Sequence, residues 1–214
     1  MSSGIKRSLR PAQPEQATVW AAKGTGLLKV SAAWISRPRE GESVCGDAVV
    51  VREQGAGVLL ALIDALGHGP KAAEVADVST HWLASAPPDD GAPGIIQGLH
   101  RALHGSRGAA GLIVVVSPKG IEACSVGNVE LRSTTNKLPF VLTPGVLGVR
   151  LRQPRTSFAA APIAERFVLF SDGISGRFDL RGLRDRSTSD AATYIFANHR
   201  HAHDDATVIV VDVA

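Results

Sequence analysis

Five aspartates of this sequence lie beside the ends of apolar segments that have the composition of buried strands. They are Asp47, Asp64, Asp172, Asp204 and Asp205. In a layered β fold the ends of several strands can meet at one rim, where such carboxylates would repel one another severely. A cation would offset the repulsion, and all-oxygen ligands favour a hard divalent ion over zinc. The pattern predicts a rim that binds Mg²⁺ or Mn²⁺. The competing interpretation is that these aspartates only open turns, a common role at strand ends.

The segments that would hold these aspartates are short apolar runs separated by Gly- and Pro-containing turns. A hairpin turn is predicted at residues 54–57, and Pro70 suits the first turn of a helix. The later helices are predicted at 95–105 and 189–201. The expected strands are 27–35, 45–53, 57–64, 110–118, 121–127, 129–134, 137–143, an apolar run within 165–175, and 205–213.

The spacing of these segments predicts the fold. Strands only a few residues apart pair antiparallel, because parallel strands need long crossovers. We expect an α+β fold, a four-layer α-β-β-α sandwich of two antiparallel sheets with helices on the outer faces. Residues 1–17 are polar and contain proline, which predicts a poorly ordered tail. Residues 18–214 would form a single domain.

Composition argues against several classes of protein. The net charge of +3, from 23 basic and 20 acidic residues, is too weak to indicate nucleic-acid binding. No apolar stretch approaches the ~18 to 20 residues of a membrane-spanning helix, and the first residues lack a signal-peptide core. Cys45 and Cys124 have no C-x-x-C spacing, which fits buried thiols in a reducing compartment. We therefore expect a cytoplasmic protein with no nucleic-acid or membrane partner.

Five short motifs, taken in their order, resemble those of the bacterial metal-dependent type-2C (PPM, SpoIIE-like) serine/threonine protein phosphatases. They are CGD (45–47), LIDALGHG (62–69), SVGN (125–128), FSDGIS (170–175) and DDAT (204–207). Each motif is weak alone, but the ordered set spans the chain from about residue 27. Within the family the short RsbX-like stressosome phosphatases are the most similar, on VCGD (44–47), RGAAG (107–111) and CSVGNVE (124–130).

The resemblance implies a reaction and a partner. Two ions, Mn²⁺ or Mg²⁺, would lower the pKa of a water that then attacks the phosphorus of phosphoserine or phosphothreonine. No cysteine nucleophile and no phosphoenzyme are expected. The implied substrates are phosphorylated STAS-domain proteins (RsbS/RsbR-like) of the stressosome.

The resemblance also assigns roles to residues. It makes Asp64 the ligand that bridges both metals, with the backbone carbonyl of Ala65 on one of them. Asp172 and Asp204 would hold the first metal, and Asp47 the second. Asp205 matches a variable neighbour of the family's ligand and is the weaker candidate. The SVGN stretch is predicted to be a tight turn rather than a substrate contact.

Ala65 departs from the glycine that the family places after its bridging aspartate. Alanine can serve if residue 65 supplies only its carbonyl and has a negative φ. At positive φ it would strain the loop by ~1 kcal/mol or more. The departure motivates an alternative function, a non-catalytic pseudophosphatase that binds phosphoproteins.

Histidines offer two further hypotheses. His68 is a candidate general acid because histidine titrates near neutral pH, and the competing role is to stabilise its turn. The alternating His199, His201 and His203 could suggest a zinc hydrolase. The competing interpretation is a helix end whose histidines complement the dipole, since no partner set of Cys or His has ligand spacing.

Overall fold

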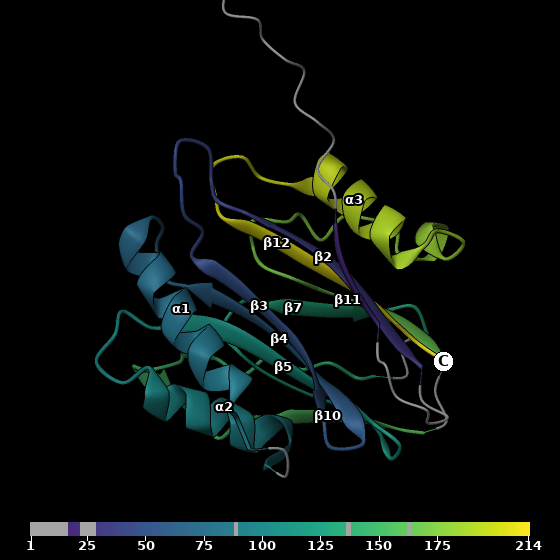
Figure 1. Cartoon of the computed structure of the whole chain (residues 1–214), viewed down its shortest axis with the longest axis horizontal. Coiled ribbons are helices and arrows are strands. Elements are labelled where there is room, and N and C mark those ends of the chain that lie inside the picture. The colour runs from purple at the N-terminus through teal and green to yellow at the C-terminus, as the bar shows by residue number, and fades with distance from the viewer. Residues whose placement is uncertain (1–16, 22–28, 88–89, 136–137, 162–163) are drawn as a thin grey trace, which may run out of the picture.

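This computed structural model describes residues 17–21, 29–87, 90–135, 138–161 and 164–214. Its strands form two five-stranded antiparallel sheets (Figure 1). Sheet A has the order β1-β2-β12-β11-β7, and its strands are β1 (Thr18–Ala21), β2 (Val30–Arg37), β7 (Glu130–Ser133), β11 (Glu165–Phe170) and β12 (Ala206–Val213). Sheet B has the order β10-β6-β5-β4-β3, and its strands are β3 (Asp47–Gln54), β4 (Gly57–Ala65), β5 (Ala109–Ser117), β6 (Gly120–Val126) and β10 (Thr156–Ala160). A small hairpin joins β8 (Gly145–Val146) to β9 (Arg150–Leu151).

Helices cover the outer faces of both sheets. Helices α1 (Pro70–Ala84) and α2 (Gly91–Ala102) pack on sheet B, and α3 (Thr188–His199) packs on sheet A, with the two sheets between them (Figure 1). A short 3-10 helix, η2 (Arg181–Leu183), precedes α3. The predicted four-layer α-β-β-α sandwich is therefore confirmed.

Strand β4 shows how the apolar runs build the core. Its side chains alternate between two faces, and both faces are buried. Leu60 and Leu62 point between the sheets, where they pack among side chains of β11 and β12. Leu59 and Ile63 pack against α1 and α2. Close packing on both sides fixes the strand, and with it Asp64 near its end.

The prediction of strand 137–143 was wrong for residues 138–143, which form no strand. Pro139 lacks the backbone N–H that a ladder needs, and Phe140 alone of the following apolar residues packs against the core. Val141 and Leu142 are exposed by 41% and 40%. The apolar run therefore covers the core as a loop.

Other boundaries differ in ways that follow from sheet pairing. Strand β7 pairs with β11 of sheet A instead of its sequence neighbour β6, so nearness in sequence misplaced it. The strand predicted at 27–35 begins at Val30, and its first two residues lie outside the described residues. Strand β10 was missed because its alternation is not apolar inside and polar outside: Ser157 and Ala159 are buried, and Phe158 is exposed. The predicted tail also lies outside the described residues, except for Ala17, which packs against the core beneath α3.

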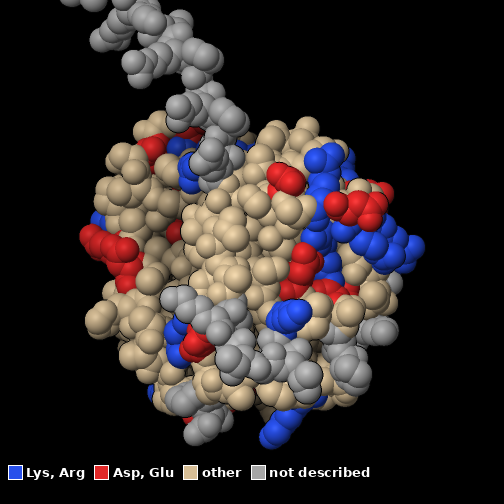
Figure 2. Space-filling model, turned by 45° about the vertical axis from the view of Figure 1, so that its right-hand side comes forward, with Lys and Arg blue, Asp and Glu red and all other residues tan. Residues whose placement is uncertain are grey.

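The surface mixes both signs of charge. On the face shown in Figure 2, Lys and Arg gather at the right-hand side, with Asp and Glu interspersed among them. In the part of the chain that the structure describes, none of the helices combines the length and hydropathy that crossing a membrane requires.

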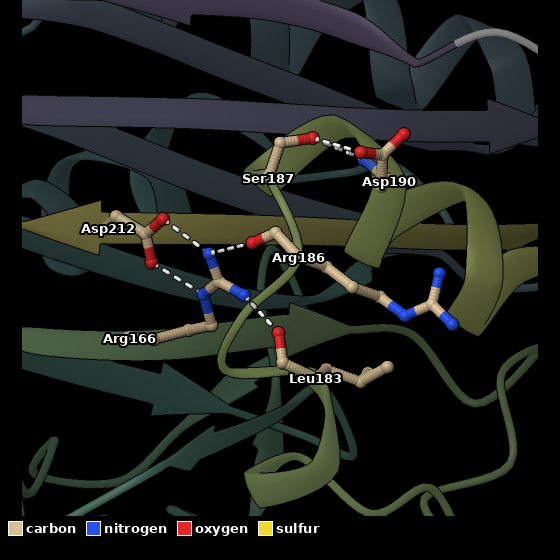
Figure 3. A network of polar contacts seen from close by, with 6 residues as sticks. All are labelled: Arg166, Leu183, Arg186, Ser187, Asp190 and Asp212. Atoms are coloured by element: carbon tan, nitrogen blue, oxygen red, sulfur yellow. Dashed lines mark hydrogen bonds and ion pairs between the residues drawn. The ribbon is translucent and has the colours of Figure 1, made fainter.

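One internal ion pair joins β11 and β12 near one end of sheet A (Figure 3). Arg166 is 8% exposed and donates from Nε and Nη2 to the two carboxylate oxygens of Asp212, both at 2.6 Å. Its Nη1 and Nη2 also donate to the carbonyl oxygens of Leu183 and Arg186. The guanidinium thus fixes the loop before α3 to the sheet.

Candidate functional site

Strand register brings the predicted aspartates of sheet B together. Asp47 opens β3 and is the direct cross-strand partner of Asp64 near the end of β4. Two acids in such a position repel each other unless one is neutral or a cation lies between them. Both side chains therefore lie at the same end of sheet B.

Sheet A supplies the remaining acids at that end of the sandwich. Asp172 comes just after β11, and Asp204 comes just before β12, which pairs with β11. Ser171, between β11 and Asp172, donates from Oγ to Oδ2 of Asp47 at 2.7 Å. This bond crosses between the sheets and joins the two pairs of acids into one cluster.

Asp47 is the most deeply buried member of the cluster, 6% exposed. Its Oδ1 has no hydrogen-bond partner. Burial raises the pKa of Asp47 to about 7, opposed by hydrogen bonds from Ser171 and Thr207 and reinforced by neighbouring aspartates. A buried carboxylate oxygen without a partner is costly, and a cation would satisfy it.

Asp64 and Asp172 interact with each other across the two sheets. Burial, followed by the charges of Asp47, Asp172 and Asp204, raises the pKa of Asp64 to about 9. The pKa of Asp172 is raised as well, first by burial and then by Asp204. Burial and mutual repulsion thus favour the protonated forms of these acids, and a cation would favour their ionised forms.

The sequence analysis missed a hydrogen bond between Asn128 and one of the acids. The side-chain amide of Asn128 donates to Oδ2 of Asp172 at 2.6 Å. Gly127, at φ 91°, allows the turn that points Asn128 toward the acids. The predicted tight turn over SVGN was wrong for Ser125 and Val126, which belong to β6, and the chain bends only at Gly127 and Asn128. Asn128 also orients a candidate ligand. The position of SVGN among the motifs was the available signal.

Asp204 and Asp205 differ in what occupies their oxygens. Asp205 is 4% exposed, and its Oδ1 and Oδ2 accept hydrogen bonds from the backbone N–H groups of Arg39 and Gly46 at 2.8 and 2.7 Å. Asp204 is half-buried, and its Oδ1 accepts a bond from the backbone N–H of Asp205 at 2.9 Å. Asp205 is therefore engaged in holding the loop before β3, and Asp204 has an oxygen to offer.

Ala65 belongs to strand β4 and pairs with Ala109 of β5. Its N–H donates to the carbonyl of Gly46 at 3.1 Å, and the residue is 1% exposed. Extended backbone is open to any residue, so alanine causes no strain here. The positive φ values of this loop fall instead on Gly67 and Gly69, at 84° and 70°.

The histidines do not form a zinc site. His199 packs its ring against Phe178 and Tyr194, whereas His201 and His203 lie against each other at 5.5 Å between ring centroids. His68 is on the exposed turn after β4, and its Nδ1 lies 2.9 Å from Oε1 of Glu42. The ring of His68 is thus oriented by a carboxylate, with Nε2 facing away from that bond.

Both cysteines are free thiols. Burial raises the pKa of Cys45 and of Cys124 to about 12. A thiol that stays protonated is a poor nucleophile, so cysteine chemistry has no support at this site.

The donor set fits a hard divalent cation. Within the described residues, no three side chains of His, Cys, Asp or Glu converge into a preformed metal cage. Oxygen-only donors and an unpartnered buried carboxylate oxygen suit a site for Mg²⁺ or Mn²⁺, which would bind these acids in their ionised form.

Comparison with known proteins places the chain among phosphatases. No family model matches the sequence. The phosphoserine phosphatase RsbX of Bacillus subtilis (strain 168) is 26% identical over 142 residues, 64% of this chain and 71% of RsbX. A chain solved in work on the bacterial stressosome, described as a modular system adapted to control secondary messenger signaling, is 30% identical. It has a TM-score of 0.80 over 86% of this chain and 99% of that chain. The chain belongs to the bacterial type-2C protein phosphatase family.

Two further structures share the fold of this type-2C phosphatase. RsbX in complex with magnesium is 19% identical, with a TM-score of 0.74 over 92% of this chain and 100% of that chain. The catalytic domain of the serine/threonine phosphatase PstP, in complex with two manganese ions, is 17% identical. Its TM-score is 0.66 over 87% of this chain and 99% of that chain.

Proposed function

We propose that this type-2C phosphatase removes phosphate from serine or threonine of STAS-domain stressosome proteins, with two Mn²⁺ or Mg²⁺ ions. The chain is a metal-dependent serine/threonine phosphatase of the RsbX type. The observation that carries the proposal is the cluster of acids contributed by both sheets, in which burial and neighbouring carboxylates raise the pKa values of Asp47 and Asp64. Residues 18–214 are proposed to be its single catalytic domain.

The residues proposed to hold the ions are the four aspartates of the cluster and the backbone carbonyl of Ala65. Divalent ions at such a site lower the pKa of a bound water and offset charge on the phosphoryl group. The chain orients its ligands through Ser171, which holds Asp47, and Asn128, which holds Asp172. Asp205 is proposed to hold the loop before β3 rather than a metal, because both its oxygens accept backbone bonds.

His68 is the proposed proton donor to the leaving alkoxide. Glu42 occupies its Nδ1, which leaves Nε2 to carry the transferred proton. The turn that holds His68 begins directly beyond β4, so the ring is near the acids in the chain and remains exposed. The same Glu42 bond would also serve a purely turn-stabilising role.

The stressosome assignment is supported by two relatives. The curated relative is a phosphoserine phosphatase, and the 30% identical chain comes from a stressosome study. The non-catalytic alternative was motivated by Ala65, and its extended backbone removes the strain on which that alternative depended.

The test is release of phosphate from a phosphorylated STAS-domain protein and from p-nitrophenyl phosphate, with Mn²⁺ and with a chelator. We expect Mn²⁺-dependent turnover of both substrates, and loss of roughly 10³-fold or more in kcat for Asp64→Asn, since metal-based stabilisation is worth several kcal/mol. Asp77→Asn, an exposed acid on α1, is the matched control. Full activity of Asp64→Asn, or an inactive wild type with every divalent metal, would contradict the proposal.

A further inference from the structure

Arg107 lies against the turn that follows Asp64. Strands β4 and β5 pair Ala65 with Ala109, and the N–H of Leu66 continues the ladder by donating to the carbonyl of Gly108 at 3.0 Å. Arg107 is the next residue outward, and its Nη1 donates to the carbonyl of Leu66 at 3.0 Å. The guanidinium is therefore bound to the residue that comes two positions after Asp64, the candidate bridging ligand.

Gly67 leaves the space that this guanidinium occupies. A Cβ at Gly67 would lie 2.7 Å from Nη1 of Arg107. Any larger residue would therefore displace the arginine from the turn. The glycine serves two purposes, a positive φ of 84° and room for a cation over the turn.

The guanidinium is available to a ligand. Arg107 is exposed, and no carboxylate of the described residues forms an ion pair with it. Its bond to Leu66 uses one N–H, whereas a guanidinium carries five donors in a planar fork. Such forks bind two phosphate oxygens at once. The bond to the Leu66 carbonyl, in contrast, needs only one donor.

Two exposed apolar residues belong to the loops around Arg107. Leu66 is 45% exposed and Val149, in the turn between β8 and β9, is 62% exposed. Val149 reaches the same loop, because its Cγ2 would lie 3.0 Å from a Cβ at Gly108. A cation in loops that also present exposed apolar groups suits a phosphorylated residue with an apolar neighbour.

We propose that Arg107 binds the phosphoryl group of the phosphoprotein substrate and that Val149 contacts an apolar side chain beside the phosphorylated residue. The inference rests on the proposed function, since it names how the same site recognises its substrate. It assigns to the two residues separate tasks. Arg107 acts on any phosphate ester, and Val149 acts only on a protein substrate.

The experiment compares KM and kcat of variants on p-nitrophenyl phosphate and on a phosphorylated STAS-domain protein, with saturating Mn²⁺. We expect Arg107→Ala to raise KM about tenfold on both substrates and to change kcat less. The KM of Arg107→Lys should lie between those of Arg107→Ala and the wild type. Val149→Ser should raise KM on the protein substrate alone. Arg101→Ala, an exposed arginine at the end of α2, is the control.

Direct binding of inorganic phosphate to the Mn²⁺-loaded protein, measured by calorimetry, separates this inference from the proposed function. Weaker binding by Arg107→Ala supports the inference even if the wild type turns over no phosphoprotein. Equal phosphate affinity and equal KM in Arg107→Ala and wild type would overturn it. A lower Tm with unchanged KM and phosphate affinity would reduce Arg107 to a support of the turn.

Discussion

Strands β11 and β12 have charged side chains at both of their ends, but the charges that surround the acids differ between the two ends. At one end Arg166 forms two bonds with Asp212 (Figure 3). At the other end Asp172 follows β11 and Asp204 precedes β12, and both face further acids of sheet B. We call the end with Arg166 and Asp212 the compensated end, because the charge of the acid is balanced by a basic side chain of the protein. The end with Asp172 and Asp204 is the uncompensated end, because its acids face other acids.

The difference teaches which aspartates serve the fold and which serve a ligand. Asp212 has its cation within the chain, and the pair holds the loop before α3. At the other end, burial and then the neighbouring carboxylates raise the pKa values of Asp47 and Asp64. A protein retains a costly arrangement of this kind where function requires it.

Breaking the compensated end should have the largest effect on stability. Arg166→Met leaves Asp212 and two carbonyl groups without their donor, and we expect the free energy of unfolding to fall by about 2 to 4 kcal/mol. Urea denaturation measures this, and Asp212→Asn should cost less because Asp212 is partly exposed. Metal-dependent kcat/KM of the folded variant should stay within about twofold. A larger loss of activity than of stability would show that the two ends are coupled.

Filling the uncompensated end with metal should stabilise the protein in a pH-dependent way. The folded pKa values of Asp47 and Asp64, about 7 and about 9, exceed their ordinary value of 3.8. The metal-free folded state therefore holds protons that the unfolded chain releases. Its stability is greatest below about pH 4 with respect to these groups and falls as pH rises toward about 9.

Because metal binds the ionised acids, Mn²⁺ should raise Tm more at about pH 8.5 than at about pH 6. Each kcal/mol of added stability should raise Tm by roughly 2 to 4 °C in a chain of this size. Thermal unfolding with Mn²⁺ and with chelator at both pH values provides the measurement, and Asp64→Asn should reduce the difference. A rise in Tm that is equal at both pH values would contradict the assignment.

Asn128 tests whether the uncompensated end is oriented by its neighbours. Loss of a group that orients a metal ligand typically costs about 10- to 100-fold in metal affinity or activity, and we expect that range for Asn128→Ala. Mn²⁺ titration of activity measures it. Asn198→Ala, on α3, is the control because its amide bonds only to the Tyr194 carbonyl. Equal effects of the two variants would remove Asn128 from the site.

Ala65→Gly should have the smallest effect. Glycine in a strand interior loses more conformational freedom on folding, so we expect a loss of about 0.5 to 1 kcal/mol in stability. The concentration of Mn²⁺ needed for half-maximal activity should not change, because the extended backbone already accepts alanine. Tighter Mn²⁺ binding by Ala65→Gly would mean that alanine does hinder one metal.

The apolar runs explain why much of the fold could be predicted. Strands β3 and β4 begin and end within two residues of their predicted limits, because each run is apolar and ends at a turn. The run after Leu138 was misjudged because apolar composition does not reveal whether a loop or a ladder covers the core. The partner of β7 was also out of reach, since sheet membership depends on contacts distant in sequence.

The sequence identified which acids belong to the candidate site, but it did not show which partners their side chains contact. Spacing and order identified the aspartates, and these remain proposed ligands. The two bonds from Asp205 to backbone N–H groups depend on a loop more than 150 residues earlier, and no local pattern reports that. The bond from Asn128 to Asp172 has the same origin. Side-chain partners across sheets follow from the tertiary fold alone.

Strand β12 lies between β2 and β11 in the middle of its sheet, although it comes last of all the described strands in sequence. During synthesis, β2 can pair only with β1, and β11 only with β7, until residues 206–213 have left the ribosome. Both would then present open edges, which favour aggregation. Pairing across such sequence distances is slow, so completion of this sheet is expected late in folding. A chain that stops short of residues 204–213 lacks both Asp204 and the central strand of sheet A, so it cannot complete the acid cluster.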